Sequence, residues 1–110
     1  MNDHQIGIAV TITKFVDTAQ PGFVECLLTD AHNNEWLFVD KVPIVTCEDL
    51  DETSSYPQVG QLTCKILSRR TDESGRSIIL VDTSHPCYIE SVTGETQFEV
   101  LEEQIVTMTW

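Results

Sequence analysis

The stretch FVECLLTDAHNNEWLFVD, residues 23–40, contains the pattern that decides the fold. Apolar and polar residues alternate with a period of two on both sides of a short polar segment, DAHNN. Successive side chains of a strand point to opposite faces, so this alternation is typical of half-buried strands. The asparagines between them tolerate the backbone conformations of a tight turn. The stretch therefore predicts a β-hairpin.

Similar alternation recurs along the rest of the chain. The stretches IGIAVTIT (6–13), QLTCKILS (61–68) and SIILVDT (77–83) predict further strands, and CYIES (87–91) with TQFEV (96–100) predicts another hairpin. The C-terminal stretch LEEQIVTMTW (101–110) predicts a short helical turn followed by a strand. One apolar face of each strand should enter the core. The predicted core residues are Ile8, Val10, Val24, Cys26, Leu28, Trp36, Phe38, Leu62, Cys64, Ile66, Ile79, Val81, Ile89, Phe98 and Val100.

About seven short strands, without a second apolar core or a linker, predict one all-β domain over residues 1–110. We expect a small, partly open β-barrel of the OB or SH3-like kind, because barrels remove exposed strand edges. A β-sandwich is the alternative. The longest apolar runs have four residues and the N-terminus lacks the features of a secretory signal. We therefore expect a cytoplasmic protein without membrane association.

The charge of the chain is strongly one-sided. Eighteen acidic residues face six basic ones, for a net charge of −12. Such a chain repels polyanions as a whole. Lys65, Arg69, Arg70 and Arg76 form a basic cluster in the sequence, but no aromatic residues alternate with it to stack on bases. Nucleic-acid binding is therefore disfavoured, and an acidic face for a basic partner protein is favoured.

The segment VDTSHPC, residues 81–87, places His85 two residues before Cys87 and raises the question of a chemical site. A reactive thiol needs a nearby cation or helix N-terminus, whereas Asp82 and Glu90 flank this segment. Structural zinc sites usually contain two close pairs of ligands, and no second pair is present. We expect His85 in an exposed turn and Cys87 packed beside Ile89 as a small apolar residue.

Catalytic motifs are absent from the sequence. No G-x-S-x-G, phosphate-binding glycine loop or dinucleotide motif occurs. Asp82, Ser84 and His85 are close in sequence, but a catalytic triad is defined by geometry. The sequence favours a non-enzymatic protein without metal or cofactor; a hydrolase, a small-ligand-binding barrel and an OB-like nucleic-acid-binding module are the alternatives. We expect free, reduced thiols at the four cysteines, Cys26, Cys47, Cys64 and Cys87.

The segment from Cys47 to Gly60 interrupts the alternation and is the strongest candidate for a binding surface, because long loops are often functional. Thr46 and Asp49 fit the start of a short helical turn. Tyr56 is the expected aromatic anchor of an interface. The alternative is that Tyr56 folds back onto the domain while the acids only solvate the loop. The expected acidic contacts are Glu48, Asp49, Asp51 and Glu52.

These observations favour a protein-binding module whose partner is basic, for example an immunity or inhibitor protein that masks a basic toxin. A homodimer is also expected, because the predicted strands have apolar residues on a second face. The residues of this second face are Leu27, Leu37, Val39, Ile78 and Leu80.

The motifs DKVPIV (40–45), YPQVG (56–60) and VDTSHPCYIES (81–91) are followed by Gly94, Phe98 and Val100 in a G-x-x-x-F-x-V pattern. Together they resemble short bacterial β-rich proteins with no assigned function. The resemblance extends from about Phe23 to Ile105. It implies a stand-alone domain of bacterial cytoplasmic origin and carries over no catalytic or binding residue.

Overall fold

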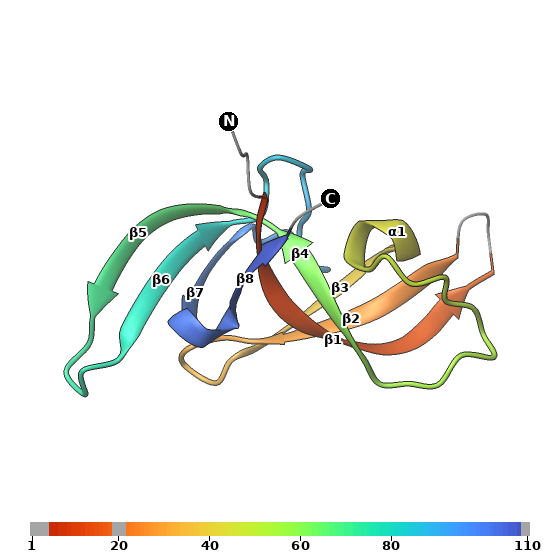
Figure 1. Ribbon diagram of the computed structural model, residues 1–110, viewed down its shortest axis with the longest axis horizontal. Helices are drawn as coiled ribbons and strands as arrows, with labels where there is room; N and C mark the ends of the chain where they lie inside the picture. The colour runs from red at the N-terminus through yellow and green to blue at the C-terminus, as the bar shows by residue number, and fades with distance from the viewer. Residues whose placement is uncertain (1–4, 19–21, 109–110) are drawn as a thin grey trace.

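Strands dominate the computed structural model, which describes residues 5–18 and 22–108 (Figure 1). A helical turn α1 (Val42–Val45) follows the third strand, and a 3-10 turn η1 (Glu102–Gln104) precedes the last one. The strands are β1 (Gln5–Asp17), β2 (Phe23–Thr29), β3 (Glu35–Lys41), β4 (Gln58–Thr63), β5 (Lys65–Thr71), β6 (Ser77–Asp82), β7 (Gln97–Leu101) and β8 (Ile105–Met108).

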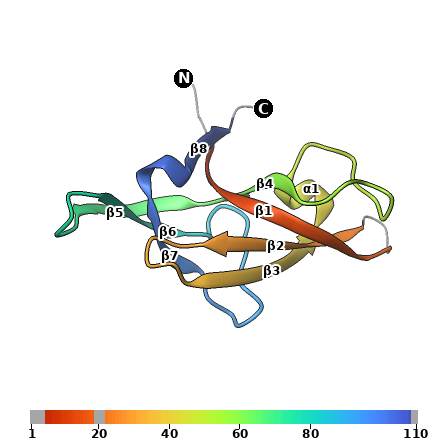
Figure 2. The same ribbon diagram turned by 90° about the horizontal axis from the view of Figure 1, so that it is seen from below.

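The first sheet is built around β1, and its strands run in the order β3-β2-β1-β4 (Figure 2). All pairings of β1 are antiparallel. Its first half pairs with β8, its second half pairs with β2, and β4 pairs with its middle. A strand has two edges, so β8 and β2 share one edge of β1 while β4 occupies the other. The long β1 therefore connects the N-terminal hairpin to the C-terminal strand.

The second sheet contains β5, β6 and β7, in that order and all antiparallel. Only Cys64 separates β4 from β5, so one bent segment passes from the first sheet into the second. On the other side, η1 connects β7 to β8 and returns the chain to β1. The all-β prediction is confirmed. The strands of the described residues form two sheets and no closed barrel.

The core lies between the two sheets, and most of the predicted core residues are buried in it. Trp36 and Ile66 are half-buried and pack against the same cluster. The ring of Phe98, on β7, meets the ring of Trp36 edge-on at 5.3 Å and that of Phe38 at 5.6 Å. These aromatic contacts join β3 to the second sheet. Four buried members of the core were not predicted, namely Ile12, Val42, Val45 and Leu50.

The turn between β2 and β3 fastens the first sheet to the second. The buried Asp30 carboxylate accepts hydrogen bonds from the backbone N–H groups of His32 and Asn34 and from the Trp36 indole, each at 2.9 Å. Burial acts to raise the pKa of Asp30, but these hydrogen bonds lower it below its usual value. The backbone N–H of Ala31 then donates to the Glu99 carbonyl on β7 at 2.9 Å.

The side chain of Glu99 adds further contacts between the turn and the second sheet. Its carboxylate accepts hydrogen bonds from the Arg70 guanidinium at 2.9 and 3.1 Å, and it lies 2.7 Å from the His32 ring. The hydrogen bonds from Arg70 and His32 lower the pKa of Glu99 to about 2. One carboxylate therefore joins β5, β7 and the turn between β2 and β3.

The predicted helical turn at Thr46 is wrong in position. The helical turn is α1, and it ends where that prediction began, because the Thr46 backbone N–H donates to the Val42 carbonyl at 3.1 Å. Pro43 favours this earlier position, since a proline in the first turn has the correct φ and needs no hydrogen-bond acceptor. The Thr46 hydroxyl instead accepts from the Glu48 backbone N–H at 3.1 Å.

The strand predicted for CYIES is also wrong, because residues 83–96 form an irregular loop. The buried Thr83 organises this loop. Its backbone N–H donates to the Thr96 carbonyl at 2.8 Å, and its hydroxyl donates to the Ile89 carbonyl at 2.5 Å. Ile89 is buried as predicted, but Cys87 is exposed, so the packing expected for its thiol is wrong. The helical turn predicted at the C-terminus is the 3-10 turn η1, and the predicted strand is present as β8 up to Met108; residues 109–110 lie outside the described residues.

Candidate functional site

The segment between α1 and β4, residues 46–57, is named the acidic loop here. Its middle is held on the domain by Leu50, which is buried in the core cluster although acidic residues surround it in the sequence. The ring of Tyr56 is half-buried and packs against the same cluster. The loop ends at β4, where Gly60 passes so close to Ile12 and to the Val45 carbonyl that a Cβ would lie within 3.0 Å of both.

Two of the five predicted site residues support the loop itself. The Asp51 carboxylate accepts hydrogen bonds from the backbone N–H and the hydroxyl of Thr53, at 2.9 and 2.6 Å. These hydrogen bonds lower the pKa of Asp51. The Tyr56 hydroxyl donates to the Asp51 carbonyl at 2.7 Å. This geometry agrees with the alternative in which Tyr56 folds back, and a contact of Asp51 or Tyr56 with a partner stays a prediction.

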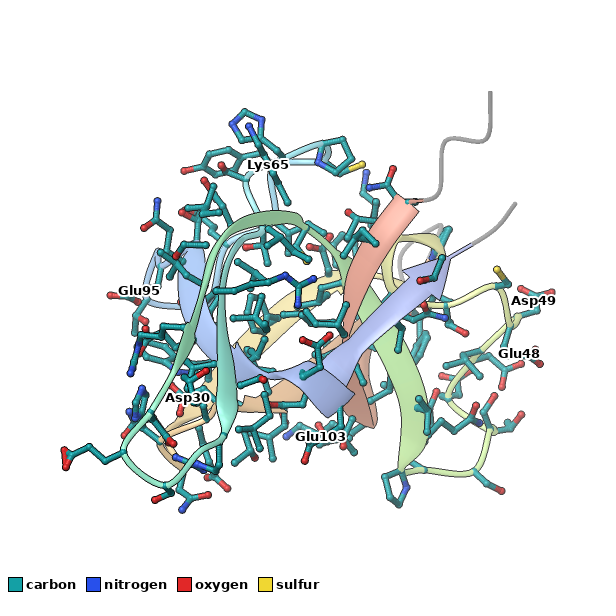
Figure 3. All side chains as sticks on the ribbon, turned by 60° about the vertical axis from the view of Figure 1, so that its left-hand side comes forward. Asp30, Glu48, Asp49, Lys65, Glu95 and Glu103 are labelled. Carbon is teal, nitrogen blue, oxygen red and sulfur yellow. The ribbon has the colours of Figure 1, made fainter. Side chains whose placement is uncertain are left out.

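The other three predicted site residues, Glu48, Asp49 and Glu52, point their carboxylates into solvent. Within residues 5–18 and 22–108, these carboxylates make no hydrogen bond and no ion pair. Figure 3 shows Glu48 and Asp49 on one flank of the molecule, away from Asp30, Lys65 and Glu95. We call Glu48, Asp49 and Glu52 the free carboxylates. The loop is thus attached to the core through Leu50 and Tyr56, while the free carboxylates on its exposed surface have no partner among the described residues.

The basic cluster predicted on β5 and β6 is largely neutralised by acids. Arg69 lies 2.5 Å from Glu102, and Arg76 lies 2.8 Å from Asp72. The Arg70 guanidinium is bound to Glu99, as described above. Three of its four members are therefore in surface ion pairs, and within the described residues only the Lys65 ammonium is left without an acidic partner to attract a nucleic-acid backbone.

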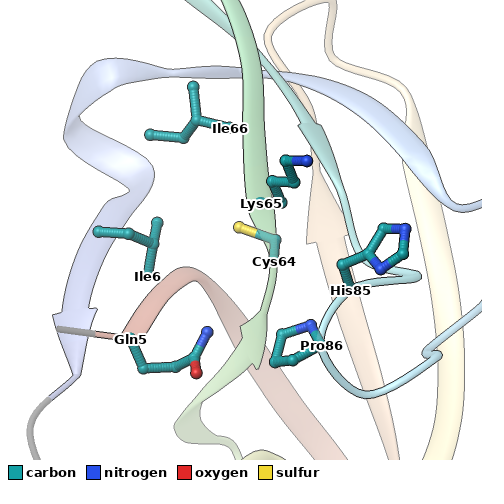
Figure 4. A pocket seen from close by; sticks show the side chains of 7 residues that line it. All are labelled: Gln5, Ile6, Cys64, Lys65, Ile66, His85 and Pro86. Carbon is teal, nitrogen blue, oxygen red and sulfur yellow. The ribbon is translucent and has the colours of Figure 1, made fainter. Parts of the chain in front are cut away.

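The VDTSHPC segment borders a shallow hollow. His85 and Pro86 line one side of this hollow, whose volume is about 330 Å³ (Figure 4). The Asp82 carboxylate accepts a hydrogen bond from the Ser84 backbone N–H at 2.8 Å, so it caps the local turn. Hydrogen bonds from Ser84 lower the pKa of Asp82. The hollow also contains Cys64, and burial raises the pKa of this thiol to about 12, which makes it a poor nucleophile.

The four cysteines differ in their exposure to solvent. All four are free; Cys26 and Cys64 are buried, whereas Cys47 and Cys87 are exposed. Burial also raises the pKa of Cys26 to about 12. In the part of the chain that the structure describes, no three His, Cys, Asp or Glu side chains are grouped so that they could hold a metal ion. No helix of the described residues is long and apolar enough to cross a membrane.

Comparison of the chain with protein-family models, with curated proteins and with solved structures finds no match. The resemblance to short bacterial β-rich proteins therefore stays a prediction. The role of Leu50 as the anchor of the acidic loop was missed in the sequence. The available signal was a single leucine among acidic and polar residues, with no periodicity to indicate that it is buried.

Proposed function

We propose that this domain binds a basic protein through the acidic loop. The observation that supports the proposal is that some residues of the loop are buried against the core while its free carboxylates are exposed and, within the described residues, unpaired. Leu50 and Tyr56 fasten it to the core, while Glu48, Asp49 and Glu52 have no partner within the described residues. A loop that is already ordered loses little conformational entropy when a partner binds.

The negative charge of the chain also favours a basic protein as the partner. The net charge of −12 attracts a basic surface from a distance, and the free carboxylates then face the lysines and arginines of that surface. Charged contacts of this kind raise the association rate more than the final affinity. An inhibitor of the immunity type, which must reach a basic enzyme quickly, would benefit most from this arrangement.

A binding surface also needs an apolar contact that becomes buried in the complex. Val59, on β4 directly after the acidic loop, is 79% exposed and supplies such a contact. The half-buried Tyr56 lies three residues before it in the chain. We infer that the partner covers Val59 and the exposed part of the loop together.

Three further features are proposed for the same domain. We propose that the two sheets form a partly open barrel of the OB or SH3-like kind, supported by the continuity of β4 and β5 and by the return of β8 to β1. A cytoplasmic location is proposed from the sequence alone. A homodimer is supported by Leu37 and Val39 on β3, which are 39% and 45% exposed, whereas Ile78 of the expected second face is buried within the chain itself. Light scattering tests it, because a strictly monomeric mass at high micromolar concentration would exclude the dimer.

The binding proposal is tested by capture of partners from the lysate of the native host. The test variant is Glu48→Gln/Asp49→Asn/Glu52→Gln, which removes the free carboxylates without shortening the side chains. The matched control is Glu73→Gln/Glu90→Gln/Glu103→Gln, which changes the net charge equally at exposed positions outside the loop. A basic protein captured by the wild type and the control, but lost with the test variant, is the expected result. Equal capture by all three would contradict the proposal.

A further inference from the structure

The hollow beside the VDTSHPC segment has the size and composition of a small-molecule site. Three separate parts of the chain line it: Gln5 and Ile6 at the start of β1, residues 64–66 at the junction of β4 and β5, and His85 with Pro86 after β6. Its volume of about 330 Å³ is at the lower end of the roughly 300–1,000 Å³ that is usual for ligand sites. A ligand of this hollow is therefore small.

The lining is divided into an apolar side and a polar side. In Figure 4, Ile6 and Ile66 lie on one side of the strand that carries Cys64, and Lys65 and His85 lie on the other. Ile6 and Ile66 are half-buried, so they present apolar surface without being covered completely. A ligand that fits both sides has an apolar body and a polar end.

The charge of the polar end follows from Lys65. Lys14, like Arg69, Arg70 and Arg76, has an acidic partner within 4.0 Å. The Lys65 ammonium has no ion pair or hydrogen bond in the described parts of the chain, although Asp82 is opposite Lys65 in the β5–β6 register. The Asp82 carboxylate is engaged by Ser84 instead. An unpaired ammonium group beside apolar surface, in a chain of net charge −12, is suited to a carboxylate.

We propose that this hollow binds a small apolar carboxylate, with its carboxylate at Lys65 and His85 and its hydrocarbon part against Ile6 and Ile66. Histidine adds a hydrogen-bond donor to the same end of the ligand. Burial, and after it the charge of the nearby Asp82 carboxylate, raises the pKa of the Cys64 thiol to about 12, so the thiol between the two sides is neutral. Asp82 is the acid that a bound carboxylate would have to approach, and its oxygens already accept a hydrogen bond from Ser84. A free short fatty acid and the C-terminal residue of a peptide both have this chemistry.

This site is independent of the acidic loop. Lys65 lies on a different part of the molecule from Glu48 and Asp49 (Figure 3). The ligand of the hollow and the partner of the loop therefore do not compete for the same surface, and either proposal can fail without the other.

The experiment is a titration of the folded protein with hexanoate, followed by the NMR shifts of the Ile6 and Ile66 methyl groups. Hexanamide is the neutral probe of the same length, and N-acetyl-leucine represents the end of a peptide. The test variant is Lys65→Gln. The matched control is Lys41→Gln, which removes the same charge from an exposed lysine that does not line the hollow. Circular dichroism of both variants confirms that they are folded.

We expect saturable shifts with hexanoate or N-acetyl-leucine, and the probe that binds identifies the source of the carboxylate. Lys65→Gln should weaken binding by roughly tenfold, because it removes one charge-assisted contact, while Lys41→Gln binds as the wild type does. Hexanamide should bind more weakly than hexanoate by a similar factor. The proposal is overturned if neither carboxylate binds, if hexanamide binds equally well, or if both lysine variants lose the same affinity.

Discussion

Asp30 organises the turn between β2 and β3, whose residue Ala31 contacts the second sheet. Its buried carboxylate accepts three hydrogen bonds, from His32, Asn34 and Trp36. These bonds satisfy donors that would otherwise be partly withdrawn from water, which is the costly situation for a polar group. The sequence indicated a turn at this place, but it did not show that the turn has a buried acid at its centre.

Replacement of this carboxylate should weaken the fold. We expect Asp30→Ala to lower the free energy of unfolding by about 2–3 kcal/mol, because donors of a charge-assisted network are left without an acceptor. Urea denaturation at neutral pH measures the loss. Asp30→Asn keeps one acceptor oxygen and should lose less. A change below about 0.5 kcal/mol for Asp30→Ala would show that water replaces the carboxylate without cost.

Glu99 makes stability depend on pH in a defined range. Its pKa is about 2 in the folded protein, below the usual value of 4.5, so the folded state favours the ionised form. Its contribution is complete above pH 4.5 and is lost as the pH falls toward 2. We expect Glu99→Gln to flatten the decrease of unfolding free energy between these limits. Denaturation curves across that range test it, and a decrease as steep as that of the wild type would exclude this role.

At the scale of elements, local alternation predicts strands well and loops poorly. The hairpin of β2 and β3 was predicted because each strand has one buried face, so apolar residues recur at every second position. CYIES has the same alternation, yet it forms an irregular loop. The loop is held by Thr83, whose backbone N–H donates to the Thr96 carbonyl and whose hydroxyl donates to the Ile89 carbonyl. These contacts join residues 6 and 13 positions apart within one loop, and a period-two pattern does not predict them.

The acidic loop illustrates a second limit of the sequence. Its acids were recognised as candidates, but their division into supporting and free carboxylates depends on hydrogen bonds that the sequence does not display. Asp51 is bonded to Thr53, whereas Glu48 and Glu52 are not bonded within the described residues. The position of α1 before the loop, set by Pro43, was likewise misjudged by a few residues.

Leu50 should decide whether this loop stays ordered. We expect Leu50→Ala to lower the free energy of unfolding by about 2–3 kcal/mol, as a leucine at the edge of a core does when truncated. Amide hydrogen exchange in residues 46–57 should accelerate more than it does in β1. Exchange that accelerates uniformly over the whole domain would show that Leu50 stabilises the core and does not anchor the loop.

At the scale of the whole molecule, the all-β class of the fold was predictable, but the division of its strands into two sheets was not. Apolar alternation and turn residues establish an all-β domain. The chain passes from β4 into β5 at Cys64, and it returns from β7 through η1 to β8. Both β4 and β8 pair with β1, from which they are far apart in sequence. Nothing in a local pattern determines which strands meet, so the two sheets had to be observed.

The charge distribution is also a property of the whole molecule. Acids outnumber bases by eighteen to six, and four of the six bases have acidic partners within 4.0 Å. The remaining acids leave the domain strongly negative, and the free carboxylates of the acidic loop are three of its acids without a partner among the described residues. Long-range attraction of a basic protein is therefore expected to be general, while the final contact is expected to be local.

The association rate of a captured basic partner tests this central claim most directly. It is measured at several salt concentrations for the wild type, for Glu48→Gln/Asp49→Asn/Glu52→Gln and for the control Glu73→Gln/Glu90→Gln/Glu103→Gln. The loop variant should associate about tenfold more slowly than the control at low salt, with a weaker salt dependence, because it lacks the charges nearest the interface. Equal rates and equal salt dependence for the two variants would contradict a binding role for the acidic loop.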